Sequence, residues 1–331
     1  MSSTLTHVLR THRHLPAVYS CGHVLLVEPA VFRFNEETSA TNAFQRVPVA
    51  NASALPEAAL EQHRALQRLL AARGLIVTVF QAAADTPDAP FCNNWFSTHP
   101  AMKGLRDGHG MMEEDVPATL VLYPLMARNR RLERRRELVE GLFRRLYPRV
   151  INMAHHEDRG LYLESTGSLC MDDANRTVYA ALSERTHRVL AEAWADKMGY
   201  RLVAFTATDD KGLPYYHTNV MMFVGHGVAA VCLESIADPT ERQAVEEALS
   251  TSGLAVVPIT RRQVLEFCGN ALSLTNGSGE RLLVMSSRAW NGFDAGQRAV
   301  LEAHCEVLHT DLSVFEDVGG GSARCLIGEL F

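Results

Sequence analysis

The chain has 331 residues, of which 47% are hydrophobic and 21% charged, a composition that is typical of a folded globular protein. Its formal net charge of −6 provides no basic surface for nucleic acid or for an anionic membrane. No apolar run approaches the length of a membrane span. We therefore expect neither a nucleic-acid nor a membrane partner.

The seven cysteines are odd in number and include no C-x-x-C pair. This pattern argues against a disulfide framework and against a structural zinc site. His155, His156 and Glu157 likewise have no partner at zinc-ligand spacing. We therefore expect reduced thiols and a cytoplasmic location. The sequence implies neither a metal nor an organic cofactor.

Residues 1–20 contain Arg and His but no acid, and they predict a loose tail before a single domain over residues 21–331. The first strand is expected over 24–29, and a helix over 56–74 follows it. A second unit is expected to contain strands over 75–80, 91–98 and 119–124 and then a helix over 130–146. Its arginine run at 128–136 indicates either a solvated helix face or an arginine that holds a substrate carboxylate.

The same order of strands and a helix then recurs three times. Short β-branched runs separated by Gly, Asn and Asp predict the strands, and apolar residues spaced three or four apart predict the helices. The strands are expected over 150–156, 161–171, 176–183, 201–208, 215–225, 228–234, 254–260, 269–276 and 281–287, and the helices over 184–199, 239–253 and 294–304.

The last two expected strands, at 306–313 and 324–331, lack a following strand and helix. The N-terminal strand and helix would supply these missing parts, so the two ends of the chain are expected to pair and to close a fifth module. The prediction is an α/β propeller of five ββαβ modules with pseudo-fivefold symmetry.

Glu164, His217, Asn270 and Cys325 occupy equivalent places in successive units, with spacings of 53, 53 and 55 residues. Side chains at one position of such a ring converge on its axis. Cys325 is then a candidate thiolate nucleophile, His217 an acid and base, and Glu164 the group that orients the array.

This arrangement resembles the pentein superfamily, which includes arginine deiminase, agmatine deiminase, dimethylarginine dimethylaminohydrolase and glycine amidinotransferase. The resemblance covers about residue 24 to the end. GGGSARC is similar to the glycine-rich segment that precedes the catalytic Cys of the family, which corresponds to Cys325 here. YHTN is similar to the segment with the family's catalytic His, and LESTGS to the segment with its catalytic Glu. These correspond to His217 and Glu164.

A closer resemblance is to the citrulline hydrolases (citrulline ureidases), an arginine-deiminase-related subgroup. It rests on FRFNEETSATNAFQ, NNWFSTHP, LYPLMARNRRLERR, LESTGSLCMD and HTNVMM. The subgroup usually has Gly where this chain has Ser165, a residue with fewer backbone conformations.

Relatives that act on guanidinium groups have carboxylates where this chain has Asn94 and Asn219, and an arginine near Asn93. An amide offers both a donor and an acceptor, which suits a neutral ureido group better than a guanidinium ion. The alternative is that these asparagines only form turns. In the polar stretch after the first strand, Asn35 and Asn42 either bind the α-amino end of the substrate or belong to a surface loop.

The resemblance implies cysteine-dependent hydrolysis of a ureido or guanidino C–N bond, with citrulline giving ornithine, carbon dioxide and ammonia. The alternatives are a guanidino hydrolase of the arginine deiminase or dimethylarginine type, and a non-catalytic pentein binding protein. The oligomeric state is left open, with a homodimer as one option.

Overall fold

The computed structural model describes residues 20–48, 52–102 and 115–331. The tail expected over residues 1–20 falls almost entirely outside these ranges. The described residues form five three-stranded sheets, each with the same strand directions. In every sheet the central strand is antiparallel to one neighbour and parallel to the other. The predicted five-module ββαβ fold is therefore confirmed.

The strands follow the chain in order, and four sheets contain consecutive strands. The bounds are β2 (Ile76–Gln81), β3 (Phe96–His99), β4 (Thr119–Leu122), β5 (Arg149–Asn152), β6 (Cys170–Asp172), β7 (Thr177–Ala181), β8 (Arg201–Phe205), β9 (Met222–Val224), β10 (Val228–Val231), β11 (Ala255–Pro258), β12 (Leu272–Thr275), β13 (Arg281–Ser286) and β14 (Glu306–Thr310).

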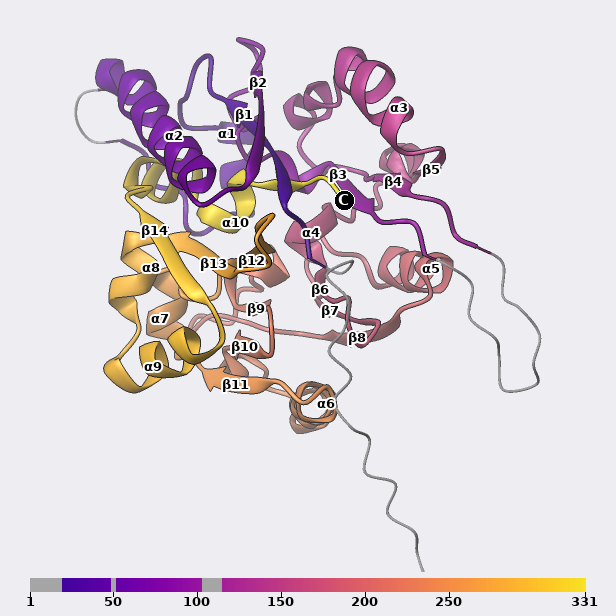
Figure 1. Ribbon diagram of the computed structural model, residues 1–331, viewed down its shortest axis with the longest axis vertical. Coiled ribbons are helices and arrows are strands. Elements are labelled where there is room, and N and C mark those ends of the chain that lie inside the picture. The colour runs from indigo at the N-terminus through magenta and orange to yellow at the C-terminus, as the bar shows by residue number, and fades with distance from the viewer. Residues whose placement is uncertain (1–19, 49–51, 103–114) are drawn as a thin grey trace, which may run out of the picture.

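The remaining sheet contains both ends of the described chain. β1 (His23–Glu28) lies between β2 and β15 (Gly328–Glu329), and it pairs antiparallel with β15 through Val24 opposite Glu329 and Leu25 opposite Gly328. Figure 1 shows the yellow C-terminal segment beside the indigo β1. The pairing that the sequence predicted between the two ends is present.

Helices surround the strands, and one helical connection crosses over in each module from the central strand to its parallel neighbour (Figure 1). The helices are α1 (Glu36–Ser39), α2 (Leu55–Ala72), α3 (Arg144–Leu146), α4 (Ser165–Ser168), α5 (Arg188–Met198), α6 (Pro239–Thr251), α7 (Arg261–Leu265), α8 (Ser287–Gly292), α9 (Ala295–His304) and α10 (Ala323–Leu326). Among the described helices, none is both long and apolar enough to cross a membrane.

Local sequence explains where several of these helices begin and end. The Asp238 side chain accepts from two backbone N–H groups at the start of α6, and Pro239 follows it. Asp294 and Gln297 form a reciprocal capping pair at the start of α9. Gly199 ends α5 with φ of 69°, a left-handed conformation that glycine adopts without strain.

The helix expected over 130–146 is wrong as a single element. Residues Asn129–Glu133 form a 3₁₀ turn, Glu137–Phe143 form a π-helix, and only α3 is α-helical. Arg130 and Glu133 form a buried ion pair inside the first turn, at 2.8 Å from Nε to Oε1. Burial of these charges sets the local backbone, whereas the amphipathic pattern alone predicts a regular surface helix.

The core lies between the sheets and their helices. Central strands β4, β7 and β10 are buried at every residue, because a helix covers one face and neighbouring modules cover the other. At about 25 cal/mol per Å², complete burial of one Val or Leu side chain stabilises the fold by roughly 1.5–3 kcal/mol.

The C-terminal strand also binds the next module through Thr98 of β3. The Thr98 hydroxyl donates to the carbonyl of Glu329 at 2.8 Å and accepts from the Phe331 N–H at 3.1 Å. We expect Thr98→Val to lower the free energy of unfolding by about 1–3 kcal/mol, because two partly buried backbone groups lose their partner. Urea unfolding measures the change. Thr177→Val is the control, since that buried hydroxyl bonds only locally, to the Asn175 carbonyl. Equal losses in both variants would contradict the role of Thr98.

Candidate active site

Each module contributes a buried polar side chain just before its antiparallel outer strand. These residues are Asn94, Glu164, His217, Asn270 and Cys325, and each is at most 3% exposed. Direct contacts join Glu164 to His217 and Asn270 to Cys325. The equivalence seen in the sequence therefore corresponds to spatial convergence.

The local structure around these residues differs from the expected strands. Asn94 ends a 3₁₀ turn, α4 follows Glu164, another 3₁₀ turn follows His217, and Cys325 lies within α10. Short apolar runs are compatible with either a strand or a buried helical turn, so periodicity does not separate the two. The expected strands over 91–98, 215–225 and 324–331 are thus wrong in their first halves, and the one over 161–171 is a strand only at its last two residues.

His217 and Glu164 form a buried pair, with 2.8 Å between Nε2 and Oε2. Burial alone would raise the pKa of Glu164, but the Arg185 guanidinium and the hydrogen bond from His217 lower it to about 2. Arg185 lies 3.6 Å from Oε2, and the Met126 N–H donates to Oε1 at 3.0 Å. Glu164 is therefore a held carboxylate that cannot act as an acid at neutral pH.

His217 is neutral at neutral pH, because burial lowers its pKa to about 4 against the opposing effect of Glu164. A carboxylate only accepts hydrogen bonds, so Nε2 carries the ring proton. Nδ1 then has a lone pair, and no described residue bonds to it. In the resting state His217 is a proton acceptor at Nδ1.

Ser165 follows Glu164 with a φ of 47°, in the left-handed region that favours glycine. Its hydroxyl donates to the Phe96 carbonyl at 2.6 Å, a bond that glycine could not make. This bond offsets the backbone strain, and it ties the Glu164 turn to β3.

Cys325 follows three consecutive glycines. A Cβ atom at Gly319 would lie 2.4 Å from the Phe91 ring, and one at Gly321 would lie 2.8 Å from it. Gly320 has a φ of 65°. Only glycine fits this close approach and this conformation. The segment thereby reaches Ser322, whose carbonyl accepts from the Cys325 N–H at 2.9 Å.

A cavity of about 20 Å³ lies beside Cys325 and His217. Its lining also includes Thr38, Asn42, Asp88, Phe91, Asn94, Arg130, Arg185, Tyr216, Gly319 and Gly321. This volume holds about one water molecule. A ligand larger than a water molecule therefore requires displacement of lining groups when it binds.

Three charged residues of this cavity are not among the individual site residues predicted from the sequence, although Arg130 belongs to the arginine run at 128–136. Asp88 accepts from the Asn35 amide at 2.8 Å and from the Thr38 hydroxyl at 3.0 Å through Oδ2, whereas Oδ1 has no partner in the described part of the chain. Burial raises the pKa of Asp88. Arg130 and Arg185 are the other two. No spacing signal singles out Asp88, because its neighbours in space come from distant segments.

The interpretation of the arginine run as a solvated face is wrong for Arg130 and Arg134. Arg130 binds Glu133 with both Nε and Nη2, at 2.8 and 2.9 Å, and Arg134 binds both oxygens of Glu157, at 2.7 and 2.9 Å. Arg130 is only 3% exposed. Arg130 therefore forms part of the cavity wall, whereas Arg134 is paired with Glu157 outside the lining.

The five asparagine candidates have different positions. Asn94 lines the cavity, and Asn219 contacts the Cys325 sulfur at 3.7 Å through Nδ2. Asn42 also lines the cavity, but its amide donates to the Gly319 and Gly320 carbonyls. The Asn35 amide positions Asp88. Asn93 donates to Thr166 at 3.1 Å and does not belong to the lining.

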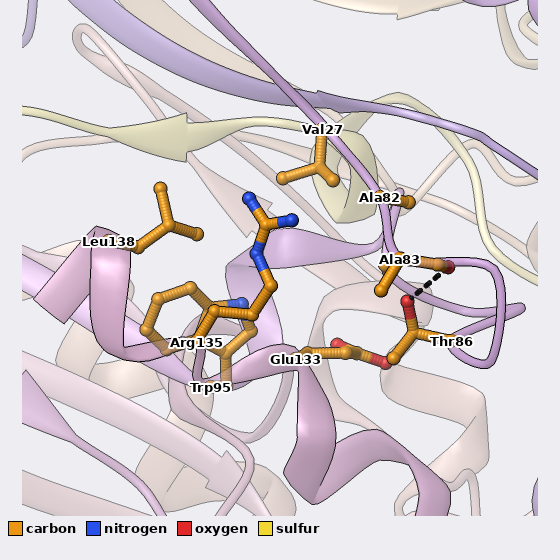
Figure 2. Close-up of a pocket in the computed structure, with 9 residues that line it drawn as sticks. Val27, Ala82, Ala83, Thr86, Trp95, Glu133, Arg135 and Leu138 are labelled. Carbon is orange, nitrogen blue, oxygen red and sulfur yellow. Dashed lines mark hydrogen bonds between the residues drawn. The ribbon is translucent and has the colours of Figure 1, made fainter.

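A second cavity, of about 10 Å³, lies on the other side of the Arg130–Glu133 pair. Figure 2 shows the Arg135 side chain extending into it between Val27, Ala82 and Leu138. Glu133 lines this second cavity, and its partner Arg130 lines the first. The ion pair is therefore the partition between them.

Within the residues that the structure describes, no group of three or more His, Cys, Asp or Glu side chains has the geometry of a metal site. All seven cysteines are free.

Five ββαβ modules around a buried Cys, His and Glu define the fold of the pentein superfamily, whose members include arginine and other guanidino hydrolases. The sequence profile of the N,N dimethylarginine dimethylhydrolase family, eukaryotic, matches residues 28–331. The chain belongs to this family. No curated protein matches the sequence significantly.

Solved structures have the same fold. Unliganded AgrE superposes with a TM-score of 0.69 at 18% identity, over 93% of this chain and 39% of AgrE. The substrate-bound N-terminal domain of ArgZ, an arginine dihydrolase from the ornithine-ammonia cycle in Cyanobacteria, gives 0.68 at 18%, over 93% of this chain and 97% of that domain. A dimethylarginine dimethylaminohydrolase adduct with 4-chloro-2-hydroxymethylpyridine gives 0.60 at 16%, over 94% and 100%. The chain spans only 40% of the longer ArgZ chain. At these identities the likeness is one of fold.

The lowered pKa of His217 predicts a pH-dependent contribution to stability. Between pH 6.5 and about 4 the unfolded chain takes up the proton and the folded chain does not, so the free energy of unfolding falls as the pH falls. In this window, the difference in the free energy of unfolding between the wild type and His217→Gln should fall by up to about 1.4 kcal/mol for each unit that the pH is lowered. Chemical unfolding at several pH values measures it.

His99→Gln is the matched control, since His99 is buried and its pKa is lowered to about 3, yet it does not line the cavity. This variant should show the same pH effect and keep its turnover. Parallel stability curves for wild type and His217→Gln would show that His217 is protonated in the folded protein.

Proposed function

We propose that residues 21–331 form one catalytic domain that hydrolyses a C–N bond of a ureido amino acid, with citrulline as the preferred substrate. Cys325 is the nucleophile, His217 transfers protons, and Glu164 orients His217. The family match and the convergence of these three side chains support a hydrolase over a non-catalytic binding protein.

The observation that carries the ureido substrate is the orientation of the Asn94 amide. Arg130 donates through Nη1 to Asn94 Oδ1 at 2.7 Å, and a guanidinium group only donates. Asn94 therefore turns its Nδ2 away from Arg130, and this NH₂ group has no partner among the residues described. A free donor in the cavity wall matches a ureido oxygen and opposes a guanidinium ion, which has only N–H groups.

Asn219 supports the same substrate, because it contacts the Cys325 sulfur, which the substrate must reach, although it does not itself line the cavity. Its Nδ2 faces Cys325, and its Oδ1 has no partner in the described structure. This oxygen is suited to accept from a ureido NH. One free donor and one free acceptor together match the polarity of a neutral ureido group.

The charged residues of the cavity support a substrate with an α-amino acid end. The unpaired Oδ1 of Asp88 matches an ammonium group, and the guanidinium groups of Arg130 and Arg185 favour a carboxylate in the same cavity. Each of these side chains is less than 9% exposed, so its charge acts in a region of low dielectric constant.

The protonation states define a balanced sequence of steps. The Cys325 sulfur bonds to the ureido carbon while its proton passes to His217 Nδ1. His217 returns this proton to the departing nitrogen as the C–N bond breaks, which releases ornithine and leaves a carbamoyl thioester. Water then bonds to the thioester carbon and gives a proton to His217, which passes it to the leaving sulfur. The carbamic acid formed decomposes to carbon dioxide and ammonia.

A second candidate is a guanidino hydrolase that acts on arginine or a methylated arginine. The family match favours it, and so does Asp88, because its free carboxylate oxygen could pair with a guanidinium instead of an ammonium. The two candidates differ in whether Asp88 or Asn94 faces the reacting end of the substrate.

Cys325→Ala should abolish turnover and leave the fold intact, because it removes the nucleophile and replaces a small buried side chain. Citrulline, arginine, agmatine and methylated arginines form the test panel, with products identified by mass spectrometry. Agmatine, which lacks the carboxylate, should be a poor substrate. Cys92→Ala is the control, since this thiol is buried but donates to backbone carbonyls outside the cavity lining. Full activity of Cys325→Ala would refute the thiol mechanism.

Asn94→Asp should lower kcat/KM for citrulline relative to arginine by roughly ten- to a hundredfold, since a donor to the ureido oxygen becomes an acceptor. Asn93→Asp is the matched control, because the neighbouring side chain binds Thr166 instead of lining the cavity. A wild-type preference for arginine, or an unchanged ratio in Asn94→Asp, would exclude the ureido assignment.

A further inference from the structure

The sulfur of Cys325 differs from the sulfurs of Cys21, Cys92 and Cys268 in its side-chain partners. Each of those three thiols donates to a backbone carbonyl, and the hydrogen bonds that lower its pKa come from the backbone. Cys325 instead receives two amide N–H groups, from Asn270 at 3.3 Å and from Asn219 at 3.7 Å. Burial raises the pKa of Cys325, and the two amides oppose this shift, because donors directed at sulfur favour the thiolate.

Asn270 is the more tightly held of the two donors. Its Oδ1 accepts from the Arg324 backbone N–H at 3.0 Å, and its Nδ2 donates to the Asn219 carbonyl at 2.8 Å as well as to the sulfur. A backbone N–H only donates and a carbonyl only accepts, so these partners allow one orientation of the amide. The donor at the sulfur is therefore fixed before any substrate binds.

Among the described residues, no cation lies within hydrogen-bond distance of the Cys325 sulfur. Arg324, on the same helix, directs its guanidinium to the Ile327 carbonyl and to Glu329. The groups that share the cavity from other elements are Asp88, Arg130, Arg185, Tyr216 and His217. Arg130 and Arg185 are paired with Glu133 and Glu164. The amides are thus the nearest stabilising groups for a negative sulfur.

We propose that Asn270 is a positioning residue that stabilises the thiolate of Cys325 and fixes the sulfur beside the cavity. The consequence for turnover rests on the proposed function, in which Cys325 is the nucleophile. A neutral ureido substrate brings no positive charge to the site, so the anion depends on groups that belong to the protein. Asn270 contacts the sulfur but does not line the cavity, so it acts on the nucleophile and leaves substrate binding to other residues.

The test is the pH dependence with which iodoacetamide alkylates Cys325 in the resting enzyme, followed by mass spectrometry of the C-terminal peptide. Asn270→Ala removes the donor, and Asn270→Asp keeps the shape but places a carboxylate oxygen near the sulfur. In both variants the inflection should move up by about one pH unit or more, and alkylation at pH 7 should be on the order of tenfold slower. Thermal unfolding identifies the folded variants, and Asn270→Asp carries the test if the Ala variant does not fold.

Asn276→Asp is the matched control. Asn276 is a buried asparagine of the same module, but it binds the Arg73 carbonyl and the turn that ends at Glu280. Its alkylation profile should equal that of the wild type. With a substrate identified from the panel, Asn270→Ala should lower kcat and change KM by no more than about twofold, because ground-state contacts stay intact.

A folded Asn270 variant that alkylates with the wild-type pH profile overturns the proposal. The alkylation needs no substrate, so this outcome is separate from failure of the proposed function, which would appear as turnover by Cys325→Ala. A fall in stability with no change of the profile would show that Asn270 only supports the fold.

Discussion

The pairing of β1 with β15 is the constraint on which the candidate site depends. Cys325 lies only six residues before the last residue of the chain, where a free terminus would normally fray. β15 fixes this segment against β1, and Thr98 and Tyr147 bind the final backbone groups. Cys325 therefore owes its fixed position to the sheet that joins both ends of the described chain.

Buried charge is the second organising feature. Glu164, Arg185, Arg130 and Glu133 are each 5% exposed or less, and they form ion pairs around the cavity. Removing one member would leave its partner charged and unpaired at considerable cost, so these residues act as a unit. Within these pairs, Glu164 keeps the ring proton of His217 on Nε2, and Arg130 orients the Asn94 amide. Electrostatics thereby connects the wall of the cavity to the protonation states that the proposed chemistry uses.

The helical turns before the outer strands explain how a repeated fold carries a varied site. Every module delivers one buried residue to the same region, and the residue type differs from module to module. In the proposed mechanism, Asn94 binds the ureido oxygen, and Glu164 orients His217, which transfers protons. Asn270 fixes the sulfur of Cys325, which attacks the ureido carbon. One backbone arrangement thus supplies distinct functions through single side chains.

The sequence by itself determined the repeat, the ββαβ order and the register of Glu164, His217, Asn270 and Cys325. It could do so because strand and helix periodicities are local, and because equivalent positions of a repeat share one place in space. Only the tertiary structure decided that Asp88, Arg130 and Arg185 line the cavity and that the segments before the outer strands are helical turns. The partners of these residues come from segments far apart in the sequence, and burial and pairing of charges are properties of the folded chain alone.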